Sequence, residues 1–101
     1  MVIIFLPDEN MKTDIIIIDN SLDKIQQIKG VYFTSLYDNS KRIGVLAQDV
    51  QKVIPEVIST DDKGNLGVCY SSLVGLLVEG MKELNNKINN LENRILILEN
   101  K

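Results

Sequence analysis

The chain has no histidine and a single cysteine, Cys69. A disulfide within the chain needs two cysteines, and the common zinc sites of proteins need several cysteine or histidine ligands. The sequence therefore predicts no internal disulfide and no metal site, and nothing in it indicates a cofactor. Cys69 lies in an apolar, strand-like context, and we expect it to be a small residue of the core.

Long hydrophobic runs and basic clusters are also missing. The longest apolar stretches, residues 1–6 and 73–78, are far shorter than the roughly 20 residues that a membrane-spanning helix needs. Residues 1–6 also lack the basic start and the length of a signal peptide. The net charge is -3, and without a basic cluster we expect neither nucleic acid nor a membrane as a partner.

What the sequence does have is an unbroken heptad repeat near its C-terminal end. The repeat places apolar residues at alternating intervals of three and four, in positions a and d of four heptads. They are Val74, Leu77, Met81, Leu84, Ile88, Leu91, Ile95 and Leu98. Two or more helices bury such a seam between them. The alternative is one amphipathic helix folded back on its own domain.

The charged residues beside the seam favour a parallel arrangement. Lys87 and Arg94 occupy g positions, and Glu92 and Glu99 occupy the e positions five residues further on. In a parallel coiled coil these residues face each other across chains. Isoleucine or valine at a with leucine at d is typical of two strands, so the seam composition alone favours a dimer.

The length of 101 residues fits one domain. We expect an α+β fold, with a small globular part of short helices and β-hairpins at 1–72 and a coiled-coil helix at 73–101. A globular part of about 70 residues has a marginal core, and oligomerisation is a usual remedy.

The first part of the chain is rich in isoleucine and valine. Residues 2–6 favour a strand or the tail of an upstream element. The run Ile15 to Ile18 favours a strand buried on both faces or held in a subunit interface. Asn20 is a plausible N-cap for a two-turn helix that Gly30 would end.

Two hairpins and one helix are expected between this segment and the long helix. The predicted elements are a hairpin of 31–37 with 43–46 turning at 38–40, a helix over 47–54, and a hairpin over 56–70 turning at 61–65. Ser71 or Ser72 would cap the long helix.

Three segments in this order resemble one family. They are Pro7-Asp8-Glu9-Asn10-Met11-Lys12, then Gly44-Val45-Leu46-Ala47-Gln48-Asp49-Val50-Gln51-Lys52-Val53-Ile54-Pro55-Glu56, then Gly64-Asn65-Leu66-Gly67-Val68-Cys69-Tyr70 running into Leu73 and Met81-Lys82-Glu83-Leu84. They are similar to the intramolecular chaperone auto-processing domain at the C-terminus of phage tail spikes, tail fibres and endosialidases, which also occurs in a membrane-bound eukaryotic transcription factor. The resemblance spans about residues 7–98.

The resemblance implies a homotrimer that holds three copies of an upstream fibre in register while they fold, and that then cuts itself off. In the family, the cut falls before a serine that opens a Ser-Asp-x-x-x-Lys motif, with the serine as nucleophile and the lysine as its base. Here the motif matches at Asp8 and Lys12, but Pro7 stands at the serine position. Proline has no hydroxyl to deprotonate, so the family mechanism cannot run at this bond. The alternative for Lys12 is an ordinary exposed lysine beside Asp8 and Asp14.

Three functions follow from these observations. The first is a trimeric folding module for a viral or phage fibre, defective in self-cleavage. The second is an active Ser/Lys-type autoprotease with another nucleophile, and the third is a plain coiled-coil oligomerisation module. We expect the first, in a virion or a viral assembly in the host cytoplasm. If the natural chain began at Met1, a fibre client would have to come from another chain.

Overall fold

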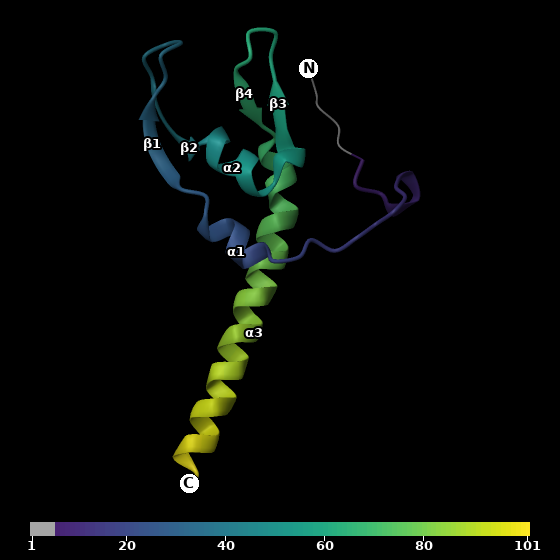
Figure 1. Cartoon of the computed structure of the whole chain (residues 1–101), viewed down its shortest axis with the longest axis vertical. Helices are drawn as coiled ribbons and strands as arrows, with labels where there is room; N and C mark the ends of the chain where they lie inside the picture. The colour runs from purple at the N-terminus through teal and green to yellow at the C-terminus, as the bar shows by residue number, and fades with distance from the viewer. Residues whose placement is uncertain (1–5) are drawn as a thin grey trace.

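The computed structural model describes residues 6–101 and has an elongated α+β fold. Its radius of gyration is 18.4 Å, whereas a compact domain of this length has a radius of about 13 Å. The long helix α3 (Leu73–Glu99) causes the elongation, because its lower half extends far beyond all the other elements (Figure 1). The strand expected at residues 2–6 lies, apart from Leu6, outside the described residues.

Short elements precede α3 in the chain. In chain order they are the 3-10 turn η1 (Glu9–Met11), helix α1 (Ser21–Gln26), strands β1 (Gly30–Thr34) and β2 (Lys41–Val45), helix α2 (Ala47–Val53), the 3-10 turn η2 (Pro55–Val57), strands β3 (Ile58–Thr60) and β4 (Leu66–Val68), and the 3-10 turn η3 (Tyr70–Ser72). The expected α+β architecture of short helices and hairpins before a long helix is confirmed. The trimeric coiled coil stays a prediction.

Both predicted hairpins are present as antiparallel pairs. Strand β1 pairs with β2, with Tyr32 opposite Ile43, and β3 pairs with β4. The turns form at the expected clusters because these residues tolerate a left-handed backbone: φ is 57° at Asn39 and 84° at Gly64. Asp61 completes the second turn, since its carboxylate accepts hydrogen bonds from the backbone N–H groups of residues 63 and 65.

The core is small and sits between α2, η2 and the first turns of α3. The buried apolar side chains among the described residues are Val50, Ile54, Val57 and Leu76. Helix α2 supplies Val50 because the predicted helical spacing over 47–54 turns this residue inward, and Pro55 follows the helix as expected. Leu76 is the α3 side chain that closes this core, which fixes the start of the long helix to the hairpins.

Helix α1 lies directly against α3, and a glycine makes the close approach possible. A Cβ atom at Gly80 would collide with the side chain of Ile25, so the absence of a side chain there lets α1 pack against the helix. The carboxylate of Glu83 then accepts hydrogen bonds from the backbone N–H groups of Ser21 (2.9 Å) and Leu22 (3.0 Å). These two bonds lower the pKa of Glu83, since they favour its charged form.

The structure corrects the expectations for the two ends of α1. Asn20 precedes the helix but its side chain makes no capping hydrogen bond, because Glu83 from α3 satisfies the free N–H groups instead. Gly30 does not end the helix. The helix ends at Gln26, and Gly30 is the first residue of β1.

The strand buried on both faces that was predicted at Ile15 to Ile18 is wrong for the single chain, whereas a strand held in a subunit interface stays a prediction. The segment is an extended arm without strand pairing, and Ile15, Ile16 and Ile17 are exposed. Ile18 is half-buried and packs against the core. The four isoleucines gave a strong β signal, but no neighbouring strand among the described residues supplies the hydrogen-bonding partners that a strand needs.

The expectation that Cys69 belongs to the core is also wrong. Its side chain is exposed, because residue 69 lies between the end of β4 and η3, where the strand alternation stops. The hydroxyl groups of Ser71 and Ser72 lie 3.4 and 3.1 Å from its sulfur, and the hydrogen bonds lower the pKa of the Cys69 thiol. Ser72 precedes α3 as predicted, but its side chain contacts Cys69 and does not cap the helix.

Candidate functional site

The predicted a and d residues form one continuous apolar stripe on the surface of α3. Every one of them is exposed, from 44% at Ile88 to 73% at Met81. Residues 84–101 are all exposed, so none of them is buried against the rest of the described chain. A contiguous apolar stripe of this length on a folded chain marks an interaction surface. The alternative of a helix folded back along its whole length does not hold for the described chain.

Two different faces of α3 explain this exposure. The upper half of the helix packs on α1 and the core through Leu73, Leu76, Gly80 and Glu83. In the heptad numbering these residues occupy positions c and g, whereas the seam occupies a and d. The chain therefore uses one face of the helix for its own fold and leaves the seam free.

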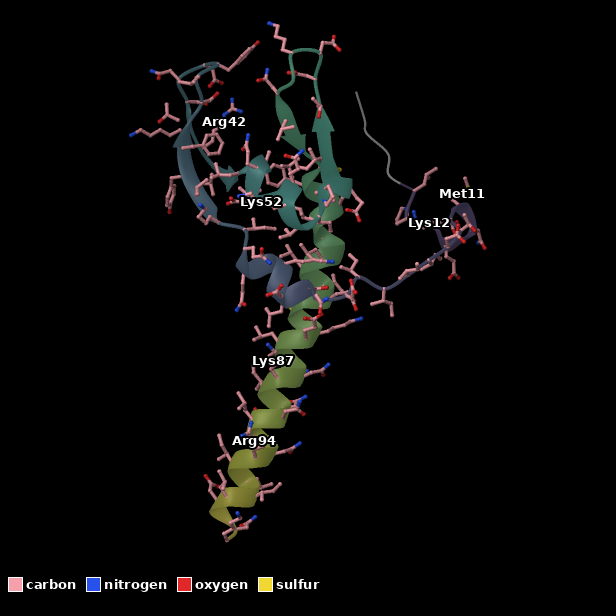
Figure 2. All side chains as sticks on the ribbon, in the orientation of Figure 1. Met11, Lys12, Arg42, Lys52, Lys87 and Arg94 are labelled. Atoms are coloured by element: carbon pink, nitrogen blue, oxygen red, sulfur yellow. The ribbon has the colours of Figure 1, made fainter. Side chains whose placement is uncertain are left out.

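The charged residues beside the seam lie along the free half of α3. Figure 2 shows Lys87 and Arg94 below the globular part, one further down the helix than the other. Neither forms a salt bridge within the described residues. Both cations remain available to the e-position glutamates of a second chain.

Lys12 of the predicted Ser-Lys motif lies on the N-terminal arm, residues 6–18, away from the hairpins (Figure 2). Asp8 caps η1, since its carboxylate accepts a hydrogen bond of 2.9 Å from the backbone N–H of Asn10. The turn of η1 brings Lys12 back toward the start of the arm, and its Nζ donates a hydrogen bond of 3.1 Å to the carbonyl oxygen of Leu6. This oxygen belongs to the peptide bond between Leu6 and Pro7.

The Lys12 amine therefore lies at the peptide bond between residues 6 and 7, the position where the resemblance implied a cut. Lys12 forms no ion pair with Asp8 or Asp14 within the described chain. All residues from Leu6 to Ile17 are exposed, so the motif is open to water in the single chain. Proline at position 7 offers no atom that could attack the carbonyl carbon.

Sequence reasoning missed an apolar surface on the β1–β2 hairpin. Tyr32, Leu36, Tyr37 and Ile43 are each more than 70% exposed, and a hollow of about 480 Å³ lies beside them on the hairpin. The alternation of residues in the strands could have indicated this face, but only the fold shows that no other element covers it. Sequence reasoning also missed a hydrogen bond that links the hairpin to η3. The backbone N–H of Val45 donates to the hydroxyl oxygen of Tyr70 at 3.2 Å.

Within residues 6–101, no helix is both long and apolar enough to cross a membrane. The same residues hold no group of three or more acidic, histidine or cysteine side chains arranged to bind a metal ion.

Comparison with known proteins identifies the family. Residues 7–59 match the family described as chaperone of endosialidase. The long tail fiber proteins Gp37 of Enterobacteria phage K3 and Enterobacteria phage T2 are each 32% identical to the chain over 102 aligned residues, covering 88% of it. The chain spans only 8% and 7% of the length of these two proteins. The matched segment contains Pro7, Asp8 and Lys12, both strands of the first hairpin and α2, and the chain belongs to the chaperone of endosialidase family.

Proposed function

We propose that this chain is the trimerisation and folding module of a phage or viral fibre protein and that it is defective in self-cleavage. The observation that carries the proposal is the exposed seam of α3, which the fold of a single chain leaves unburied. Parallel association through this seam would hold three upstream segments side by side at one end. That arrangement lowers the entropy cost of bringing three chains into register.

The trimeric state rests on the family resemblance rather than on the seam. Isoleucine or valine at a with leucine at d is the usual dimer pattern. Contacts from the globular part can override this preference, because α1 packs against the upper half of α3, next to the seam (Figure 1). Light scattering at tens of micromolar tests the proposal: a trimer supports it, and a monomer or dimer overturns it.

The client is proposed from the relatives, which are tail fibre proteins many times longer than this chain. We propose an upstream fibre or spike segment as the folding client and a virion, or a viral assembly in the host cytoplasm, as the location. The test is a fusion of a fibre fragment to the chain with residues 7–98 present or deleted. The fragment should form trimers only in the first case. Trimers in both cases would contradict the folding role, and the plain oligomerisation module would remain as the alternative.

The loss of self-cleavage is proposed from Pro7 alone. An active autoprotease would need a different nucleophile, and Ser35 and Ser72 lack the motif around them. One observation favours a former active site: Lys12 Nζ stands at hydrogen-bond distance from the carbonyl oxygen of Leu6. Intact mass measurement separates the two functions, since an active enzyme would lose the residues before position 7.

A further inference from the structure

The two sides of the α3 seam differ in a way that suggests how neighbouring chains fit together. On the g side, a pocket of about 290 Å³ lies between α1, η3 and α3. Its walls are Ile25, Ile28, Val45, Tyr70, Leu73, Leu76 and Leu77. Leu73 is a g residue and Leu77 a d residue, so the pocket opens directly beside the seam.

On the e side, the same helix carries an apolar surface. Val78 occupies an e position and is 47% exposed. It lines a shallow groove of about 510 Å³ together with the seam residues Val74, Leu77 and Met81 and the polar residues Lys82 and Asn85. Most e positions of coiled coils carry charged side chains, and a valine there needs another explanation.

The register of a parallel coiled coil brings these two surfaces together. A g residue faces the e residue that lies five positions further on in the neighbouring chain. Leu73 therefore faces Val78 of the neighbour, with the same offset that joins Lys87 to Glu92. We propose that Val78 of each chain fills the pocket between α1 and α3 of the next chain. The inference rests on the parallel association proposed above and adds the globular part to the subunit interface.

The next heptad supports the same arrangement. Its g residue is Gly80, and the end of the Ile25 side chain occupies the space where a g side chain would lie. The neighbour's e residue at this level, Asn85, therefore meets α1 instead of a charged partner. The e positions are uncharged, Val78 and Asn85, where α1 covers the g side. They become acidic, Glu92 and Glu99, where α3 is bare. The e residues therefore change from uncharged to acidic at the level where the globular part ends.

A disulfide experiment tests the contact. In a Cys69→Ser background, the pair Ile28→Cys and Val78→Cys is oxidised, and the products are separated by denaturing electrophoresis without reductant. Ile95→Cys in the same background is the control, because identical a positions meet in any parallel coiled coil. We expect covalent oligomers from the pair and from the control, and none from either single variant of the pair.

This experiment distinguishes a failure of the pocket contact from a failure of the parallel association. If Ile95→Cys forms covalent dimers but the pair gives only monomers, with or without an internal disulfide, the pocket contact is wrong and the parallel assembly stands. If neither cross-links, the parallel association is wrong, and the pocket contact with it.

A charge substitution gives a second, independent measurement. Val78→Glu would be tolerated if Val78 only flanked the seam, because e positions ordinarily accept glutamate. In an apolar pocket the carboxylate is desolvated, so we expect association to weaken by about tenfold or more. Ile97→Glu is the matched control, since Ile97 is an exposed c residue of the same helix. Equal association of both variants with the unmodified chain, measured by sedimentation, would overturn the inference.

Discussion

At the scale of single residues, Glu83 connects α1 to the long helix. Its two carboxylate oxygens accept from two consecutive backbone N–H groups at the start of α1. Lys87 further favours the charged form of Glu83, and Asp19 opposes it. Replacement of this carboxylate leaves the first N–H groups of α1 without their partner.

We expect Glu83→Gln to lower the melting temperature at pH 7, because an amide has one acceptor oxygen and no charge. The folded pKa of Glu83 lies below its unfolded value of about 4.3. The stabilisation is therefore complete above that value and is lost as the pH falls through the folded pKa. Thermal melts of both chains between pH 7 and pH 2 should converge in acid. The control is Glu99→Gln at the end of α3, and a constant gap between the Glu83→Gln and unmodified curves at all pH values would contradict the assignment.

Pro7 is the second residue with a functional consequence. We expect the unmodified chain to stay intact, because no hydroxyl lies at position 7. Pro7→Ser recreates the Ser-Asp-x-x-x-Lys motif next to the Lys12 amine, which already contacts the Leu6 carbonyl. Cleavage between residues 6 and 7 should begin, as measured by intact mass spectrometry.

The double change Pro7→Ser with Lys12→Ala is the control and should be silent. Proline also restricts the backbone of the residue before it, so Pro7→Ser could loosen the segment as well as supply a hydroxyl. The control distinguishes cleavage by a Ser-Lys dyad from cleavage caused by the loosened backbone alone. A Pro7→Ser chain that remains trimeric and full-length would mean that more of the active site than the serine has been lost.

At the scale of elements, one face of α3 packs into the core and another face is exposed. Leu76 at a c position is 1% exposed and belongs to the core, whereas Leu96 at a b position is 57% exposed. The heptad repeat alone does not distinguish these two leucines, because both lie outside a and d.

Leu76→Ala should destabilise the chain by about 2–5 kcal/mol, the usual range for a buried leucine. Leu96→Ala on the same helix should change the free energy of unfolding by less than about 0.5 kcal/mol. Chemical denaturation of both variants at equal protein concentration measures the difference. Equal effects would mean that Leu76 does not close the core.

At the scale of the whole molecule, the described chain buries few apolar side chains for its length, and this observation is consistent with the association proposed above. The buried apolar residues are only four in the part of the chain that the structure describes. The apolar seam of α3 is exposed along its whole length within the described residues, and from residue 84 onward all of α3 is exposed.

A chain that ends at residue 83 tests this dependence. It keeps Leu76, Gly80 and Glu83 but loses Leu84, Ile88, Leu91, Ile95 and Leu98. Each lost side chain contributes about 1.5–3 kcal/mol when fully buried, and total stabilities are only about 5–15 kcal/mol. The shortened chain should therefore be monomeric by light scattering and poorly folded by circular dichroism. An unchanged trimer and melting point would show that the globular part holds the assembly.

The sequence by itself determined the local elements and the positions of the apolar seam, whereas the exposure of the seam was decided by the tertiary structure. Heptad spacing located α3, turn residues located both hairpins, and helical spacing located α2, because these signals act between residues close in the chain. The resemblance to the family also came from local motifs, and it is confirmed. Trimerisation and the loss of self-cleavage stay predictions.

The tertiary structure decided which apolar residues have partners. Ile15 to Ile17 carry a stronger apolar signal than Val50, yet Val50 is buried and the isoleucines are exposed. Cys69 is exposed for the same reason, and Glu83 rather than Asn20 caps α1. Burial and long-range hydrogen bonds depend on which elements meet in space, and local spacing carries no information about a partner some 60 residues away, the separation of Glu83 and Ser21.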